Sequence, residues 1–335
     1  MSPTKTSKKK SRGSRFPTTK KNIVTSVILL ALIYPCLDSN PYHIDVLVSS
    51  GIFMLLALGL NVIVGYAGVL NLGFAALYAV GAYTYALLSI YYHVPFWIGL
   101  WLSAFMSALF GMLLAFPALR LSGDYLAIVT LGAGEIVRIA LNNLDPITGG
   151  PNGLLGIAHP SLALGSFRMD FGVQSTPYYY LVAGLVLMTV FTLKRLENSP
   201  LGRAWVAIRE DELAASCMGV NPLSAKLWAF AIGGFIAGIA GAVFASKQGT
   251  VSPDSFDFVV SVMVLAMLVL GGMGNVAGVL LGAFTLSLLP EFLRGFDVYR
   301  MLLFGAAMIL MMLLRPQGMI GETRHLREFR SREKN

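Results

Sequence analysis

Charged residues are scarce in this chain. Of its 335 residues, 13% are charged and 56% are hydrophobic, whereas globular proteins average about 25% charged residues. A soluble domain of this size would need charged side chains across its surface. The shortage therefore argues against a soluble enzyme or binding module, and it predicts that lipid covers much of the protein.

Cysteine and histidine are also scarce. The two cysteines, Cys36 and Cys217, are too few for a disulfide framework or a zinc site, and the four histidines show no metal-ligand spacing. We therefore predict no metal site, and we expect both cysteines to be small apolar fillers.

Acidic residues are missing from the start of the chain. Residues 1–22 contain eight basic residues and no acid, a composition typical of a disordered tail. The net charge of +8 does not indicate nucleic acid, because this basic run directly precedes a hydrophobic segment, where it sets membrane topology. No small-residue cleavage site follows residues 23–35, so a secretory signal is not indicated.

Nucleotide-binding and catalytic motifs are missing too. The Gly272-Met273-Gly274 segment has no predicted strand before it and no Gly-Lys-Ser/Thr after it, as a phosphate-binding loop requires. No helix face combines His, Asp, Glu or Ser in a catalytic arrangement. We therefore expect neither ATP binding nor enzymatic activity in this chain, and no cofactor.

Hydrophobic runs of membrane length are what the chain has in abundance. We expect an all-α, polytopic membrane protein with about 8–10 transmembrane helices. The runs span residues 23–37, 46–64, 70–92, 96–119, 125–143, 178–193, 226–246, 258–270, 276–290 and 298–314. The runs at 258–270 and 276–290 are short, and an alternative is that they are half-helices meeting at a glycine-rich break.

The distribution of basic residues predicts the orientation. With ten crossings and a cytoplasmic N-terminus, the cytoplasmic segments contain 20 of the 25 Lys and Arg residues when Lys226 is counted with the loop it borders, and the external segments contain four. This asymmetry follows the positive-inside rule. We therefore divide the chain into a cytoplasmic tail (1–22), a permease domain (23–314) with a cytoplasmic loop at 194–225, and a cytoplasmic C-terminal tail (315–335).

Small residues recur at a spacing of four in the predicted helices. Gly234 and Gly238 form one such pair, and Gly274, Gly278 and Gly282 form a stripe. In lipid, small residues allow helix backbones to approach closely. Dense helix packing is the favoured interpretation.

A few polar residues fall within or beside the predicted helices. Glu135 and Arg138 have the spacing of an intrahelical salt bridge, although ionisable groups at membrane depth can also line a pathway or lie near the interface. Asn61 and Asn71 flank the short connection Gly65–Gly68. Such amides either bridge helices or contribute to a pathway or gate.

A turn-forming cluster opens the external loop 144–177. It consists of Thr148, Gly149, Gly150, Pro151, Asn152 and Gly153. This composition predicts a rigid turn. The alternative is a structured collar at the external mouth, where a delivering protein would dock.

The cytoplasmic loop has the most informative polar pattern. Ser199-Pro200 and Asn221-Pro222 are helix starts, the acids at 210–212 suit a second short helix, and Gly219 suits its end. Ala214, Ala215 and Met218 are expected on one face. From these features alone, the loop is either an ordinary amphipathic connection or a knob that enters another protein, through Arg209, Glu210, Glu212, Ala214, Ala215, Met218 and Gly219.

Several blocks resemble the permeases of bacterial ABC importers. The segment 212–219 is similar to their EAA loop, with one residue inserted between the acid and the alanine pair. The blocks GLNVIVGYAGVLNLGFAALYAVGAY (59–83), TGGPNG (148–153), SPLGRAWVAIREDELAA (199–215), VLGGMGNVAGVLLGA (269–283) and LRPQGMIG (314–321) resemble the branched-chain amino acid permease family in its M-type, LivM-like subunits. A further block covers 119–143, and the resemblance runs from about residue 50 to 321.

The resemblance implies a subunit of an importer in the bacterial inner membrane. Its expected partners are an H-type permease subunit, two cytoplasmic ATPase subunits that bind the ATP, a periplasmic binding protein and membrane lipid. The implied substrates are leucine, isoleucine and valine. Urea or short-chain amides are alternative substrates, since permeases for them are close relatives, and a self-sufficient secondary carrier or channel is the alternative mechanism.

Overall fold

A computed structural model describes residues 40–119, 121, 124–164, 167–172 and 174–292, together with residues 35, 302, 305–306, 309 and 318–319. The chain divides into two units, Met1–Asn40 and Pro41–Asn335, and the fold below is that of the second. The predicted basic tail (1–22) lies outside the described residues. So do nearly all of the predicted helices at 23–37 and 298–314 and of the tail at 315–335.

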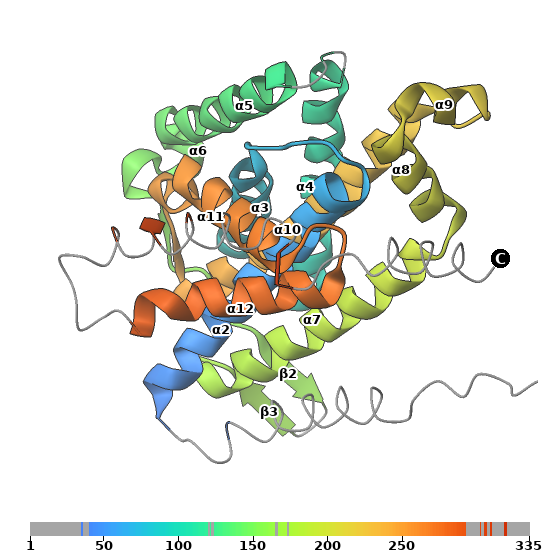
Figure 1. Ribbon diagram of the computed structural model, residues 1–335. Helices are drawn as coiled ribbons and strands as arrows, with labels where there is room; N and C mark the ends of the chain where they lie inside the picture. The colour runs from blue at the N-terminus through green and yellow to red at the C-terminus, as the bar shows by residue number, and fades with distance from the viewer. Residues whose placement is uncertain are drawn as a thin grey trace, which may run out of the picture. The chain divides into compact units, whose positions relative to one another are not determined.

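The described part of the second unit is an all-α membrane fold (Figure 1), as predicted. Seven of its helical segments are long and apolar enough to cross a membrane, and an eighth is shorter. The seven are α2 (Pro41–Leu60, continued by the π-helix η1, Asn61–Tyr66), α3 (Phe74–Tyr92), α4 (Phe96–Ala118), α5 (Asp124–Asn143), α7 (Ser175–Glu197), α10 (Pro222–Gln248) and α11 (Phe258–Gly271) with the turn before it, and the shorter eighth is α12 (Val276–Phe292). Each corresponds to one of the eight hydrophobic runs predicted between residues 46 and 290.

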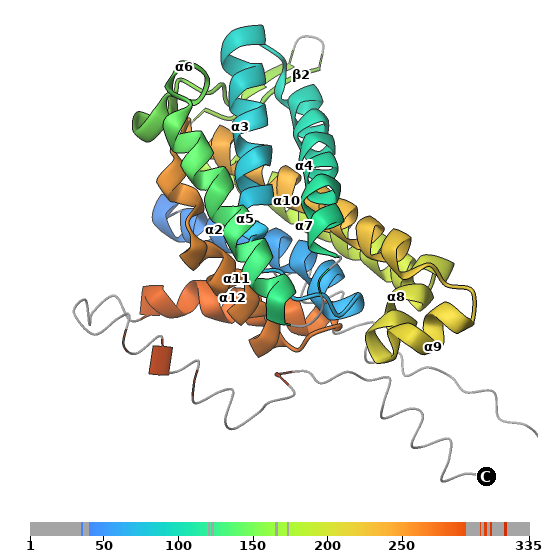
Figure 2. The same ribbon diagram turned by 90° about the horizontal axis from the view of Figure 1, so that it is seen from above.

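Two helices form the centre of the bundle. In α10, and in α2 with its π-helical extension, 72% of the most apolar 18-residue stretch is buried inside the protein. The corresponding fraction is 17% in α5 and 22% in α7. A helix that is hydrophobic on all sides is expected either in a core or against lipid. Tertiary contacts therefore decide which apolar helices are central. α5 lies along the top edge of the bundle in Figure 1 and in front of the other helices in Figure 2.

Glycines allow α10 to approach its neighbours closely. A Cβ atom at Gly81 of α3 would lie 2.4 Å from the Gly238 Cα atom of α10, and one at Gly234 would lie 2.7 Å from the Ser107 carbonyl oxygen of α4. A Cβ atom at Gly282 of α12 would lie 2.4 Å from the Met267 carbonyl oxygen of α11. The predicted dense packing at these small residues is confirmed.

The helices α11 and α12 form a hairpin that packs against α2. A 3-10 turn, η3 (Pro253–Phe256), precedes α11, and together they form a segment of 19 residues that is long enough to span. This length argues against the half-helix interpretation of residues 258–270. α12, with 17 residues, remains slightly short of a typical span of about 20.

The remaining elements form the connections. Between α5 and α7 lie α6 (Asp145–Thr148), η2 (Gly150–Asn152), β1 (Leu154–Leu155), β2 (Ser161–Leu164) and β3 (Phe167–Asp170). β2 pairs with β3 as an antiparallel hairpin, whereas β1 pairs with β4 (Thr250–Val251), the residues that follow α10. α8 (Pro200–Glu210) and α9 (Glu212–Cys217) connect α7 to α10.

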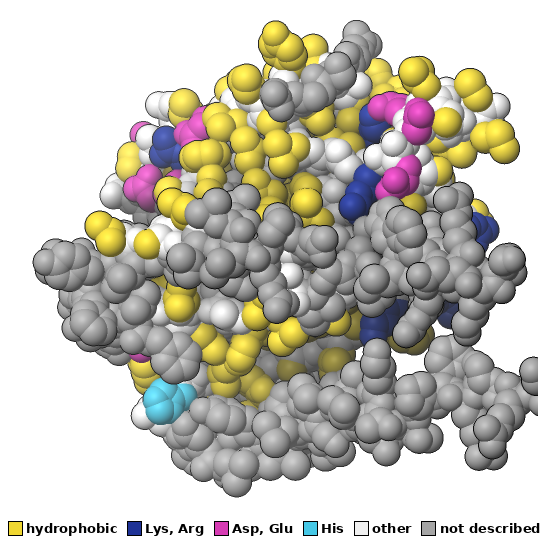
Figure 3. Space-filling view, viewed as in Figure 1, with side chains coloured by type: hydrophobic (Ala, Val, Ile, Leu, Met, Phe, Trp, Pro, Cys, Tyr) yellow, Lys and Arg dark blue, Asp and Glu magenta, His cyan; other side chains and the backbone are white. Residues whose placement is uncertain are grey.

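Hydrophobic side chains cover much of the described surface in Figure 3. The charged side chains visible in this view lie over the region of α5 and α6, over α8 and α9, and near the end of α7. Such a surface suits a bundle surrounded by lipid, with polar groups near the ends of its helices.

Replacing Gly81 by alanine should loosen the packing of α3 against α10. The added methyl group would meet backbone, which cannot move aside as a flexible side chain can, so we expect a loss of about 1–3 kcal/mol. Thermal unfolding of the detergent-solubilised protein measures the change. Gly184→Ala in α7 is the matched control, because nothing lies within 4 Å of the added atom; equal melting temperatures for the two variants would contradict the packing assignment.

Candidate functional site

The two helices α8 and α9 form within the cytoplasmic loop predicted from the sequence. Ser199 is the N-cap of α8, and its side chain accepts a hydrogen bond from the Gly202 backbone N–H. Asp211 caps α9 by accepting from the Ala214 backbone N–H at 3.0 Å. The cap at Ser199-Pro200 and the acidic start of the second helix are therefore confirmed.

The end of α9 and the start of α10 also follow the sequence prediction. Gly219 has a φ of +84°, a left-handed conformation that glycine adopts without steric cost. Asn221 caps α10 by accepting from the Ser224 backbone N–H, and Pro222 occupies the first turn. The loop therefore has a defined shape determined mainly by local interactions.

The predicted outward face of α9 needs correction. Ala215 is only 5% exposed, whereas Ala214 is exposed and Met218 is 85% exposed. Adjacent residues on a helix point about 100° apart, so Ala215 faces the protein while its neighbour faces away. The exposed apolar side chains are Met218 and Leu213, which is 79% exposed. Cys217 is exposed as well, so the prediction that it is a small apolar filler was wrong. Cys36 lies outside the described residues.

Trp205 anchors α8 to the bundle. Its side chain is fully buried, and its indole N–H donates to the Ala225 carbonyl oxygen of α10 at 2.6 Å. The indole ring stacks on Tyr66 of η1, with centroids 6.4 Å apart and planes 8° from parallel. Sequence reasoning missed this anchor, although a tryptophan in an otherwise polar loop was a usable signal.

Other predicted loop residues also point toward the bundle or lie beside it. Arg209 is half-buried, and its Nη1 donates to the Gly65 carbonyl oxygen at 2.7 Å. Glu212 pairs with Lys226 of α10 at 2.7 Å, which joins α9 to the following helix. Glu210 is exposed. The predicted site residues thus divide into two sets. Arg209, Glu212 and Ala215 hold the loop against the bundle. Glu210, Ala214 and Met218 are exposed to a partner.

Segments predicted to be cytoplasmic meet at one end of the bundle. Arg209 of α8 contacts Gly65, and the Asn61 side chain accepts from the Gly274 backbone N–H in the α11–α12 turn. The Met319 backbone N–H donates to the Leu270 carbonyl oxygen. The connections at 65–69, 194–225 and 271–275 and residue 319 therefore lie together, as the ten-crossing topology requires.

Segments predicted to be external meet at the opposite end. Lys247, in the last turn of α10, forms a 2.8 Å ion pair with Asp45 in the first turns of α2. His159 Nδ1 lies 2.7 Å from the Ser246 carbonyl oxygen, and the Tyr178 hydroxyl donates to the same oxygen. Together with the β1–β4 pairing, these contacts hold the external loop against α7 and α10.

The turn at residues 148–153 is rigid, as predicted. Thr148 donates from its hydroxyl to the Leu141 carbonyl oxygen at 2.6 Å, and Gly149, Gly150 and Gly153 all have positive φ. A Cβ atom at Gly153 would lie 2.0 Å from the Val251 carbonyl oxygen, so only glycine fits there. Pro151 and Asn152 are exposed and form its outer surface.

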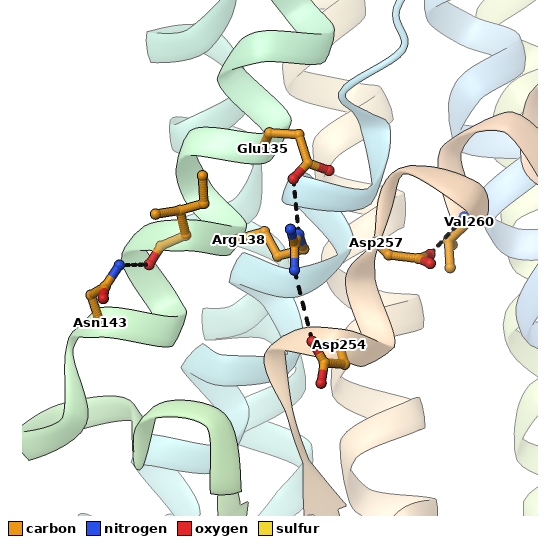
Figure 4. A network of polar contacts seen from close by, with 7 residues as sticks. Glu135, Arg138, Asn143, Asp254, Asp257 and Val260 are labelled. Carbon is orange, nitrogen blue, oxygen red and sulfur yellow. Dashed lines mark hydrogen bonds and ion pairs between the residues drawn. The ribbon is translucent and has the colours of Figure 1, made fainter.

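Glu135 and Arg138 form the predicted salt bridge, with 2.9 Å between Arg138 Nε and Glu135 Oε2 (Figure 4). The structure adds Asp254 of η3, whose Oδ1 lies 3.7 Å from Arg138 Nη1. Because η3 belongs to the external end, the pair lies toward the external part of α5. Both side chains are partly exposed at the edge of the bundle.

The two predicted asparagines are buried and make different contacts. Asn61 connects η1 to the α11–α12 turn, 213 residues away. Asn71 accepts a local hydrogen bond from the Gly73 backbone N–H at 2.9 Å, just before α3 begins. Asn61 thus bridges helices, whereas Asn71 organises the short connection. Within the described residues, no group of three or more His, Cys, Asp or Glu side chains is arranged to hold a metal ion.

Comparisons with known proteins identify relatives across almost the whole chain. The high-affinity branched-chain amino acid transport system permease protein LivM of Salmonella typhimurium is 46% identical over 323 residues, covering 91% of this chain and 76% of that protein. LivM of Escherichia coli strain K12 shows the same identity and coverage. The permease protein LivH of that organism is 23% identical over 289 residues, covering 80% of this chain.

No solved structure matches the chain. A protein family described as the permease component of the branched-chain amino acid transport system matches residues 42–312. That match includes both ends of the bundle, the α8–α9 loop and the rigid external turn. The chain therefore belongs to the family of branched-chain amino acid transport permeases and is a multi-pass membrane protein.

Proposed function

We propose that this chain is the M-type permease subunit of an ABC importer that carries leucine, isoleucine and valine across the bacterial inner membrane. The observation that carries the proposal is 46% identity to two LivM permeases over 91% of the chain. The fold agrees with it, because seven helical segments of the described part can cross a membrane.

An H-type permease is the proposed partner within the membrane. The LivH relative is itself similar to this chain along 80% of its length, so an importer containing both types would pair two related helix bundles. α5 is little buried and has the polar Glu135–Arg138 pair on it. Ionisable groups in a membrane helix usually face protein or water, so we place the second permease beside α5 and lipid around the apolar remainder.

Two ATPase subunits are proposed to bind the α8–α9 loop. The loop lies at the end of the bundle that the basic residues assign to the cytoplasm, where ATP is available. Leu213 and Met218 are the most exposed of its large hydrophobic side chains, and an exposed apolar pair with charged neighbours suits a protein interface. ATP would be bound by these partners, and this chain would need no cofactor.

A periplasmic binding protein is proposed to dock at the opposite end. The external loop has a rigid turn at 148–153 and is held to α10 through β1 and β4. A surface that is already ordered loses less conformational entropy when a partner binds. Pro151 and Asn152, on its exposed side, are the proposed points of contact.

Uptake should require the separate ATPase chains. We expect cells that produce the complete importer to accumulate radiolabelled leucine, and cells that lack the two ATPase subunits to lose this uptake. A secondary carrier would continue to transport, so undiminished uptake without the ATPases would refute the proposal. Competition by unlabelled isoleucine and valine, compared with urea and acetamide, distinguishes the amino acid assignment from the amide alternatives.

The substitutions Leu213→Glu and Met218→Glu should each weaken binding of the ATPase subunits by about tenfold or more, because a charge would be buried in an apolar contact. The amount of ATPase that co-purifies with the permease measures binding. Leu213→Met and Met218→Leu are the conservative controls and should retain it. Unchanged co-purification of both glutamate variants would show that the ATPases bind elsewhere.

A further inference from the structure

The α8 helix is connected to the centre of the bundle by a charged hydrogen bond. Arg209 Nη1 donates to the Gly65 carbonyl oxygen at 2.7 Å across 144 residues of sequence. The aliphatic part of the same side chain covers Gly68, where a Cβ atom would lie 2.9 Å from Arg209 Cγ. Gly68 also has a φ of +70°. The chain here therefore requires glycine both for its conformation and for the approach of Arg209.

The acceptor of this bond lies in an unusual helical turn. Residues 61–66 form the π-helix η1 at the end of α2. The last carbonyl groups of any helix lack N–H partners from a following turn and carry partial negative charge, so a guanidinium is a suitable donor for Gly65. Short π-helical segments occur frequently at functional sites.

The opposite end of the same π-helix contacts the α11–α12 turn. Asn61 is fully buried, and its Oδ1 accepts from the Gly274 backbone N–H at 2.9 Å. A Cβ atom at Gly65 would lie 2.0 Å from Asn61 Oδ1 and 2.7 Å from the Gly274 nitrogen. The contact between η1 and the α11–α12 turn thus has no space for a side chain at Gly65. Because the packing is this close, a displacement of η1 would also displace the turn.

The α11–α12 turn is rich in glycine. Gly272 and Gly274 have φ values of +107° and +83°, in a region of backbone conformation that glycine samples freely. The turn connects two helices that pack against each other and against α2 through their apolar faces. Its polar contact with Asn61 is therefore a specific attachment of a glycine-rich turn to a buried helix.

We propose that Arg209 and Asn61 are positioning residues of one relay, which transmits displacement of α8 through η1 to the α11–α12 turn. The inference rests on the proposed docking of ATPase subunits on α8 and α9. ATPase closure would move α8, Arg209 would move the Gly65 carbonyl group, and Asn61 would move Gly274. Trp205, stacked on Tyr66 of the same π-helix, keeps α8 aligned with it.

The relay predicts a loss of coupling without a loss of assembly. In the complete importer reconstituted in proteoliposomes, Arg209→Ala should leave ATPase co-purification and ATP hydrolysis in place. The ratio of leucine transported to ATP hydrolysed should fall about tenfold, the size of effect that follows when a charge-assisted hydrogen bond is lost. Arg209→Lys, which retains a charged donor, should restore part of the ratio. Arg203→Ala is the matched control, because Arg203 is exposed on the same helix and donates to Asn198 of its own loop.

The double variant tests whether the two residues act in one relay. Arg209→Ala combined with Asn61→Ala should lower the ratio no further than the more severe single variant, because contacts in one path are not additive. Additive losses would refute the relay. So would a normal transport-to-hydrolysis ratio in Arg209→Ala with the ATPases bound, and this result would leave the proposed function intact.

Hydrogen–deuterium exchange supplies a readout that does not depend on transport. Addition of ATP should change exchange in the 271–275 turn of the wild-type complex, and Arg209→Ala should abolish that change while exchange in α10 stays the same. An unaltered ATP response of the turn in the variant would overturn the relay. Failure of the proposed function has a different signature, since the wild-type permease would then neither retain ATPase subunits nor transport leucine with them.

Discussion

Close backbone contact between α10 and its neighbours is the constraint on which the rest of the structure depends. In lipid, the hydrophobic effect provides little attraction between helices, so packing over small residues has to provide it. Gly234 and Gly238 let α10 contact α4, and Gly81 lets α3 contact α10 at the level of the backbone. These contacts determine where both ends of α10 lie.

The α8–α9 loop and the loop that contains β1 are both attached to that one helix. At its start, Ala225 accepts the hydrogen bond from Trp205 of α8, and Lys226 pairs with Glu212 of α9. At its end, Val251 pairs with Leu154 of the external loop. A helix of 27 residues is about 40 Å long, enough to connect the two aqueous sides. Proteins bound at the two faces would therefore act on a shared rigid element.

The α8–α9 loop combines firm anchoring with an exposed tip. Its anchored side consists of Trp205 and Arg209, which contact the π-helix at the end of α2. Its tip consists of α9, where Leu213 and Met218 point away from the bundle. Such an arrangement allows force applied at the tip to reach buried helices, because the anchoring contacts are specific hydrogen bonds and ring stacking as well as apolar packing.

Much of this protein is determined by local sequence. The hydrophobic runs, the caps at Ser199, Asp211 and Asn221, the turn at Gly219 and the Glu135–Arg138 pair all depend on residues a few positions apart, and the structure confirms them. The grouping of loops at two ends follows from counting apolar runs, and the assignment of those ends to two sides of the membrane rests on the distribution of basic residues.

Only the tertiary structure decided which side chains face inward. The burial of Ala215, the inward direction of Arg209, the stacking of Trp205 on Tyr66 and the hydrogen bond from Gly274 to Asn61 involve elements far apart in the chain. Helices that are apolar on all sides have no periodicity that distinguishes a core face from a lipid face. Long-range packing resolves that ambiguity, and it made α2 and α10 the centre of the bundle and left α5 at its edge.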